Sequence, residues 1–92
     1  MSLRAPRTKI EVDVAAIWKE ILCVEHLSID DDFLHLGGDS LKAMQIAARV
    51  ADRFECDVPA SAPLRLETVA RMAEVIAAVK GGHAGSDAVW SA

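Results

Sequence analysis

The stretch Leu36-Gly37-Gly38-Asp39-Ser40-Leu41 carries the strongest signal in the sequence, because a long loop ends there and a helix is predicted to begin at Ser40. Two successive glycines allow a tight turn and leave the serine accessible to another molecule. Unpaired backbone N–H groups and the positive end of the helix dipole are expected near the Ser40 hydroxyl, which favours a phosphate group. Serine is also a common N-cap, so a purely structural role explains this short motif equally well.

Upstream of the motif, apolar residues at helical spacing predict a helix from about residue 8 to residue 22, capped by Thr8 or Asp13. The long loop over residues 23–39 is of a length that is often functional. Its apolar anchors are Leu27, Ile29, Phe33 and Leu36. The run Asp30-Asp31-Asp32 lacks the spaced ligands of a calcium loop, so we expect a solvated stretch with an Asx-type turn.

Downstream, the helix that starts at Ser40 is predicted to extend to Phe54, and residues 55–62 form a connector. A short helical turn is expected over residues 63–66, with a proline in its first turn. The last helix is predicted to follow Thr68 as its N-cap and to end near Val79. No alternating strand pattern is present, so the sequence predicts an all-α protein.

The second predicted helix has two apolar faces on a helical wheel. The face assigned to the core consists of Ala43, Ile46, Ala47, Val50 and Phe54. The outer stripe consists of Leu41, Met44, Ala48 and Ala51, and a basic sector consists of Lys42, Arg49 and Arg53. An apolar stripe rimmed by charge suggests a docking surface for partners, although packing under the long loop is the alternative. We also predict that Trp18, Ile46, Val50 and Ile76 meet in the core.

Composition excludes several classes of function. The chain has 92 residues, enough for one domain, and its formal net charge of −4 argues against a nucleic-acid partner. No apolar run approaches a membrane span, and the start lacks the pattern of a secretory signal, so we expect a cytoplasmic protein without a membrane partner. Cys23 and Cys56 have no metal-ligand spacing and are expected to be reduced and partly buried.

The letters Gly38-Asp39-Ser40-Leu41 also match the nucleophile block of GDSL-type esterases. Serine catalysis needs a positioned base and an orienting acid on a scaffold that holds them. The available histidines are His26 and His35 in the long loop and His83 near the C-terminus, and the chain is too short and too helical for that hydrolase fold. We therefore expect no catalytic residue and no metal site.

Three segments together resemble one family, the acyl and peptidyl carrier proteins, over roughly residues 8–80. They are Ile17-Trp18-Lys19-Glu20-Ile21-Leu22, the stretch from Asp31 to Leu41, and Ala47-Ala48-Arg49-Val50. The resemblance implies a four-helix bundle of acyl-carrier type, with a long loop between helices 1 and 2 and a short third helix. Residues 1–7 would then be an extension or an expression remnant, and residues 81–92 a flexible tail.

The resemblance further implies that 4′-phosphopantetheine from coenzyme A is attached to Ser40 by a phosphopantetheinyl transferase, with Gly38 and Asp39 beside it. The arm would hold acyl groups as thioesters for adenylation, condensation and other enzymes, which would contact Leu41, Lys42, Met44 and Arg49. The monomeric domain itself would catalyse nothing. The double glycine resembles peptide-synthetase carriers, but these often have histidine where this chain has Asp39, so a polyketide carrier stays open. A helical interaction module without an arm is the alternative.

Overall fold

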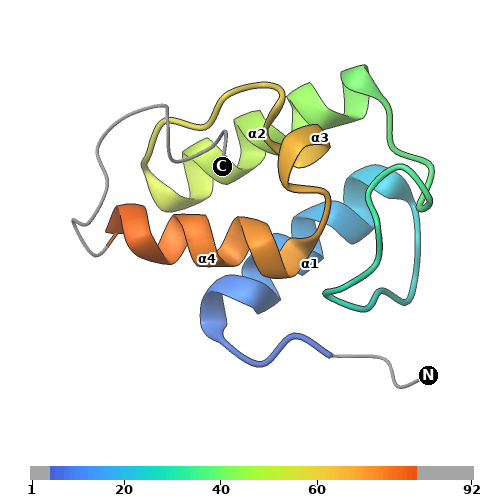
Figure 1. Cartoon of the computed structure of the whole chain (residues 1–92), viewed down its shortest axis with the longest axis horizontal. Coiled ribbons are helices and arrows are strands. Elements are labelled where there is room, and N and C mark those ends of the chain that lie inside the picture. Colours follow the sequence, from blue (N-terminus) through green and yellow to red (C-terminus); the bar gives the residue numbers. More distant parts are fainter. Residues whose placement is uncertain (1–4, 81–92) are drawn as a thin grey trace.

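The computed structural model describes residues 5–80, which form four helices and no strand. These are α1 (Lys9–Leu22), α2 (Ser40–Phe54), α3 (Ala62–Leu66) and α4 (Val69–Lys80). Helix α1 packs against both α2 and α4, and the short α3 contacts both α2 and α4 (Figure 1). This arrangement confirms the predicted all-α fold with a short third helix. The predicted extension over residues 1–7 lies partly outside the described residues, and the predicted tail over residues 81–92 lies wholly outside them.

Helix α1 begins at a capping box, which selects Thr8 rather than Asp13 as the N-cap. The Thr8 Oγ1 accepts a hydrogen bond from the Glu11 amide at 3.0 Å, and the Glu11 carboxylate accepts one from the Thr8 amide at 3.2 Å. Two backbone donors at the helix start are thereby satisfied. Asp13 lies further along the helix and forms an ion pair with Arg53 at 3.0 Å instead.

The two cysteines differ from each other, and both are free thiols. Cys56 is half-buried as expected, and its burial raises the pKa of its thiol. The expectation for Cys23 was wrong, because this side chain is exposed. Cys23 is the C-cap of α1 and has a left-handed backbone with φ of 58°. At this position, just after the last turn of α1, its side chain faces solvent.

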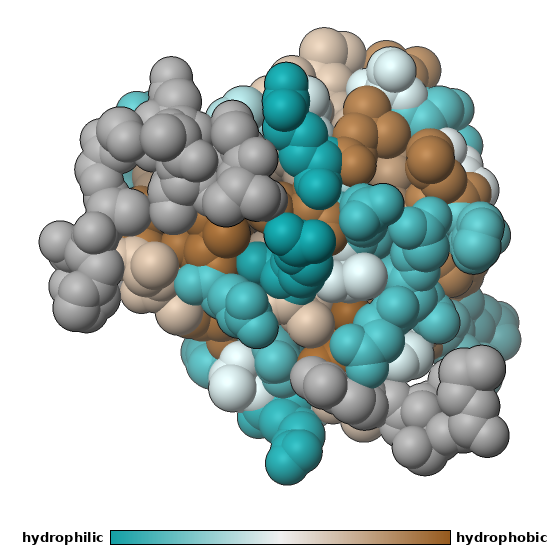
Figure 2. Space-filling view, in the orientation of Figure 1, coloured by the Kyte–Doolittle hydropathy of each residue, from teal (hydrophilic) through white to brown (hydrophobic). Residues whose placement is uncertain are grey.

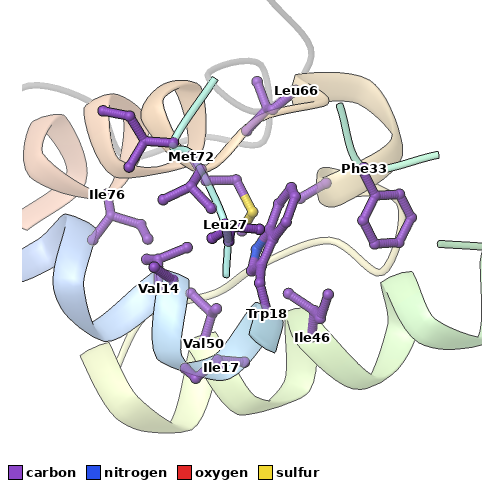
Figure 3. Packing of buried hydrophobic residues seen from close by; sticks show 14 of the residues in the cluster. Val14, Ile17, Trp18, Leu27, Phe33, Ile46, Val50, Leu66, Met72 and Ile76 are labelled. Atoms are coloured by element: carbon purple, nitrogen blue, oxygen red, sulfur yellow. The ribbon is translucent and has the colours of Figure 1, made fainter. Parts of the chain in front are cut away.

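The core lies between α1, α2 and α4, with Trp18 at its centre (Figure 3). Trp18, Ile46, Val50 and Ile76 have no exposed surface, which confirms that they meet in the core. The residues of α2 that are buried are Ala43, Ile46, Ala47, Val50 and Phe54. They are the face that the helical wheel assigned to the core, so the rotation of α2 is as predicted.

The long loop over residues 23–39 curves past one end of the bundle and is fixed to it by backbone hydrogen bonds (Figure 1). The Ile29 carbonyl accepts from the Ala70 amide at 3.0 Å, and the Phe33 amide donates to the Glu67 carbonyl at 2.7 Å. The Asp32 carboxylate accepts from the Leu34 amide at 3.0 Å, which is the predicted Asx-type turn. The middle of the loop is therefore held in a fixed position relative to α4.

The ends of α4 agree with the sequence to within one residue. Thr68 Oγ1 accepts from the Arg71 amide at 3.2 Å, as expected of an N-cap. The helix continues to Lys80, one residue beyond the predicted end, and the Lys80 ammonium group donates to the Phe54 carbonyl at 3.0 Å. This contact satisfies a carbonyl at the C-terminus of α2 and ties the ends of the two helices together.

Apolar surface left outside the core is divided into separate patches on the face drawn in Figure 2. The large exposed apolar side chains of the described residues are Val12, Leu34, Leu41 and Met44. None of the helices in residues 5–80 has the length and apolar character needed to cross a bilayer. The same residues hold no group of three histidine, cysteine or acidic side chains that could bind a metal ion.

Candidate functional site

Ser40 is the first residue of α2, and its side chain is exposed. The N-cap of this helix is the preceding residue, Asp39, whose Oδ1 accepts a hydrogen bond from the Lys42 amide at 2.8 Å. A purely structural role for Ser40 as the cap therefore does not apply, because Asp39 performs the capping. Within residues 5–80 no hydrogen bond engages the Ser40 hydroxyl, which leaves its oxygen accessible for covalent modification.

Asp39 also changes what the start of α2 offers to an anion. The hydrogen bond from the Lys42 amide holds the pKa of the Asp39 carboxyl below its usual value, and the Lys42 ammonium group at 3.7 Å and the Leu41 amide act in the same direction. The carboxylate is therefore ionised at neutral pH. The sequence predicts unpaired N–H groups beside Ser40, but the structure shows that the Lys42 amide is already taken by Asp39.

The two glycines before Asp39 serve different purposes. Gly37 has φ of +94°, a backbone conformation that favours glycine, and a β-carbon there would meet nothing within 4 Å. Gly38 has no such backbone, but a β-carbon at this position would lie 2.5 Å from the Phe33 ring. Gly37 thus makes the turn, whereas Gly38 allows the chain to pass close over an aromatic side chain.

Phe33 positions this turn, a role that the sequence alone does not indicate. Its carbonyl accepts from the Gly38 amide at 3.0 Å, and its amide donates to the Glu67 carbonyl between α3 and α4. Its ring packs edge-on against Trp18 with centroids 5.3 Å apart and is fully buried. The start of α2 is thereby linked to the core and to the junction between α3 and α4. The sequence marks Phe33 only as a loop anchor, since its contact with Gly38 depends on the folded loop.

The outer stripe of α2 is accessible, as the docking interpretation requires. Leu41 is 59% exposed and Met44 is 50% exposed, so neither packs under the long loop. Ala48 is exposed as well, whereas Ala51 is half-buried. The sequence does not single out Leu34, which is 58% exposed and whose carbonyl accepts from the Gly37 amide at 3.1 Å. An apolar side chain of the loop therefore also lies beside the glycine turn.

The basic sector of α2 is engaged in ion pairs. Lys42 contacts Asp39, and its ammonium group donates to the Gly37 carbonyl at 3.4 Å. Arg49 pairs with Glu20 of α1 at 2.9 Å, and this contact lowers the pKa of Glu20. The third member, Arg53, pairs with Asp13 of α1. Two of the three cations therefore join α1 to α2, so their positive charge is balanced within the domain.

A shallow hollow of about 430 Å³ lies between α1 and α2, lined by Ile21, Gln45, Ala48 and Arg49. It begins more than one turn of helix beyond Ser40, and its lining contains no nucleophile or histidine. His26 and His35 are both exposed on the long loop, and no hydrogen bond joins either side chain to Ser40 in the part of the chain that is described. No histidine of residues 5–80 is therefore hydrogen-bonded to the Ser40 hydroxyl as the base of a serine nucleophile would be.

Comparisons with known proteins agree with this geometry. A family model described as the phosphopantetheine attachment site matches residues 12–76. Tyrocidine synthase 3 of Brevibacillus parabrevis is 40% identical over 78 residues, which cover 85% of this chain and 1% of that protein. Bacitracin synthase 3 of Bacillus licheniformis is 38% identical over 76 residues, which cover 83% of this chain and 1% of that protein. The chain therefore spans a small fraction of these relatives.

Two solved structures are similar along most of their length. One is BlmI, a type-II acyl carrier protein from Streptomyces verticillus involved in bleomycin biosynthesis, with a TM-score of 0.73, 34% identity, and coverage of 77% of this chain and 86% of that one. The other is a peptidyl carrier protein, solved in complex with the phosphopantetheine transferase Sfp and coenzyme A. It has a TM-score of 0.76 and 32% identity, and the match covers 80% of this chain and 96% of that one. With the family model matching more than half of its residues, the chain belongs to the phosphopantetheine attachment site family and is a carrier domain.

Proposed function

We propose that Ser40 holds the phosphopantetheine arm and that the domain carries aminoacyl, peptidyl or acyl groups as thioesters in nonribosomal peptide or mixed polyketide biosynthesis. The observation that carries the proposal is that Asp39 and Ser40 have different roles at the start of α2. Asp39 caps the helix through the Lys42 amide, and the Ser40 hydroxyl is exposed and unengaged among the described residues. An attachment residue must present its oxygen to a modifying enzyme, and Ser40 does so.

The residues around Ser40 are compatible with a phosphodiester bond between the serine oxygen and the arm. During loading, the Ser40 oxygen forms a bond to the phosphorus of coenzyme A that bears the pantetheine, and the bond from that phosphorus to the adenosine bisphosphate breaks. The hydroxyl proton leaves to a base of the transferase, because no side chain among residues 5–80 is hydrogen-bonded to the Ser40 hydroxyl and the Asp39 carboxylate is engaged with Lys42. When bound, the arm supplies a terminal thiol that holds cargo as a thioester. The chain's own residues fix the position of Ser40 through Asp39, Gly38 and Phe33.

The domain acts in this proposal as a substrate of its partners and not as a catalyst. Tethering places the cargo at a high local concentration near each active site in turn. The partners are a phosphopantetheinyl transferase and the adenylation, condensation or other acyl-transferring enzymes of one synthetase. The names of the relatives support this assignment, since they are peptide synthases, and a solved complex pairs a similar carrier with a transferase. We further propose that the domain is monomeric and cytoplasmic.

Intact-mass spectrometry tests the proposed function. The chain is incubated with coenzyme A and a phosphopantetheinyl transferase, and then with an adenylation enzyme, ATP and its amino acid. We expect a first mass increase equal to phosphopantetheine and a second one equal to the aminoacyl group, which hydroxylamine releases as expected of a thioester. A folded chain that gains neither mass would be a helical interaction module without an arm, and the proposal would then be wrong.

A further inference from the structure

Asp39 already takes one of the backbone donors that the start of α2 would offer to a ligand. In a helix the first amides have no intrahelical partner, and the N-cap side chain accepts a hydrogen bond from the amide at the second or third position. Here the Lys42 amide donates to Asp39 Oδ1 at 2.8 Å, and the Ala43 amide donates to the Asp39 carbonyl at 2.8 Å. The amides of the preceding turn are engaged too, since Gly37 donates to Leu34 and Gly38 donates to Phe33.

Lys42, the cationic residue closest in sequence to Ser40, is also engaged through its side chain. The Lys42 ammonium group lies 3.7 Å from Asp39 Oδ2 and 3.4 Å from the Gly37 carbonyl. It therefore closes a small network of Gly37, Asp39 and Lys42 around the helix start. The Asp39 side chain is 58% exposed, so its negative charge is also present at the surface next to Ser40. A phosphate group near Ser40 would therefore meet a Lys42 amide that is already hydrogen-bonded and the negative charge of Asp39.

We propose that Asp39 is a positioning residue for the arm: its carboxylate occupies the Lys42 amide and places a negative charge beside Ser40, and so keeps the phosphodiester on Ser40 off the helix N-terminus. The inference rests on the proposed attachment at Ser40. Helix N-termini ordinarily attract phosphate groups, so an uncapped α2 would draw the phosphodiester back onto the domain. With Asp39 in place the arm projects away from the helix, where partner enzymes reach it.

The test compares the apo and loaded forms of the full chain by NMR, in the wild type and in two variants. Asp39→Gly removes the carboxylate and costs little as an N-cap, because glycine is nearly as good at this position. Asp39→Asn keeps a capping oxygen. In the wild type and in Asp39→Asn, we expect loading to leave the Lys42 amide proton almost unshifted. In Asp39→Gly, loading should move that proton well downfield, because a phosphate oxygen takes the place of the carboxylate.

Thermal unfolding of the same samples gives a second readout. An anion at an uncapped helix start is stabilising. Loading should therefore raise the Tm of Asp39→Gly and have a smaller effect on the wild type. A Lys42 amide that shifts equally in the wild type and in Asp39→Gly would overturn the inference, as would an Asp39→Asn protein that behaves like Asp39→Gly. Intact mass confirms loading first, so a sample that gains no arm refutes the attachment at Ser40 and is distinguished from these outcomes.

Discussion

A β-carbon on Gly38 would lie 2.5 Å from the Cε2 and Cζ atoms of the Phe33 ring. Only a glycine can therefore pack this closely against Phe33. The Gly38 amide also donates to the Phe33 carbonyl at 3.0 Å. Phe33 is held in turn by the Glu67 carbonyl and by the ring of Trp18. The position of Ser40, two residues after Gly38, therefore depends on a contact that reaches into the core.

This contact predicts the effect of Gly38→Ala. The added methyl group overlaps a buried ring, and overpacking of this kind typically costs about 1–3 kcal/mol. We expect a loss of that size in the free energy of unfolding, measured by denaturant titration. Because the overlap is with Phe33, a second change, Phe33→Leu, should make the added methyl group less costly than it is in the wild-type background.

Gly37→Ala is the matched control for that experiment. A β-carbon at Gly37 meets nothing within 4 Å, but its φ of +94° is strained for any other residue. The cost of this change, roughly 1–2 kcal/mol, arises from the backbone and should not respond to Phe33→Leu. If Phe33→Leu relieves both alanine variants equally, the close contact between Gly38 and Phe33 does not explain the second glycine.

The core predicts a larger effect at Ile46, which has no exposed surface. Ile46→Ala removes buried methylene groups and leaves a cavity, so we expect a loss of about 2–5 kcal/mol in denaturant unfolding. Leu41→Ala, on the exposed stripe of the same helix, should change the free energy of unfolding by about 0.5 kcal/mol or less. A loss below about 0.5 kcal/mol at Ile46 would show that α2 is rotated away from the described position.

The sequence was sufficient for the elements that depend on local pattern. The start of α2 and its buried face follow from apolar spacing, and the Asx-type turn follows from short-range chemistry at Asp32. The sequence pointed to Ser40 and not to Asp39 as the candidate N-cap, because the adjacent serine is an equally good cap. The pairing of Arg49 with Glu20 was also missed, since it joins residues 29 positions apart and requires the packing of α1 against α2.

The exposed stripe predicts a functional effect of Met44→Asp. Met44 is 50% exposed beside the start of α2, and a charge there would have to be buried without a partner when an enzyme docks. We expect slower loading by the transferase or slower acyl transfer, with the free energy of unfolding changed by about 0.5 kcal/mol or less. Kinetics with several partners provide the measurement.

Ala77→Asp controls for net charge in that experiment, because Ala77 is exposed on α4, outside the stripe. Rates that fall for Met44→Asp alone support docking on the stripe. Unchanged rates for Met44→Asp would exclude the stripe as a contact surface. Lys42 and Arg49 remain predicted to steer partners, and since both are paired, their neutralisation should affect association less than an unpaired cation would.

The ion pair between Glu20 and Arg49 predicts a pH dependence of stability. The Arg49 guanidinium holds the pKa of Glu20 below its ordinary value of 4.5. A carboxyl with a depressed folded-state pKa stabilises the fold fully above its unfolded-state pKa and loses that contribution as the pH falls through the lower folded-state pKa. The difference in unfolding free energy between the wild type and Glu20→Gln should therefore shrink as the pH falls below 4.5.

Low-salt denaturant titrations at several pH values measure this difference, because both side chains are exposed and salt screens the pair. Glu74→Gln, an exposed change on α4, gives the background effect of losing one carboxylate. A difference for Glu20→Gln that stays constant down to about pH 3, or that matches Glu74→Gln throughout, would show that the contact between Glu20 and Arg49 does not stabilise the domain.

The attachment of the arm to Ser40 is tested most directly by the intact mass of Ser40→Ala after incubation with coenzyme A and a transferase. Ser28 is 4% exposed and Ser61 Oγ accepts from Arg65 at 3.2 Å, so neither described serine presents a comparable hydroxyl. Because Asp39 caps α2, Ser40→Ala should fold with wild-type stability. We predict that the wild type gains the mass of phosphopantetheine and that folded Ser40→Ala gains none. The same gain in both proteins would contradict the account.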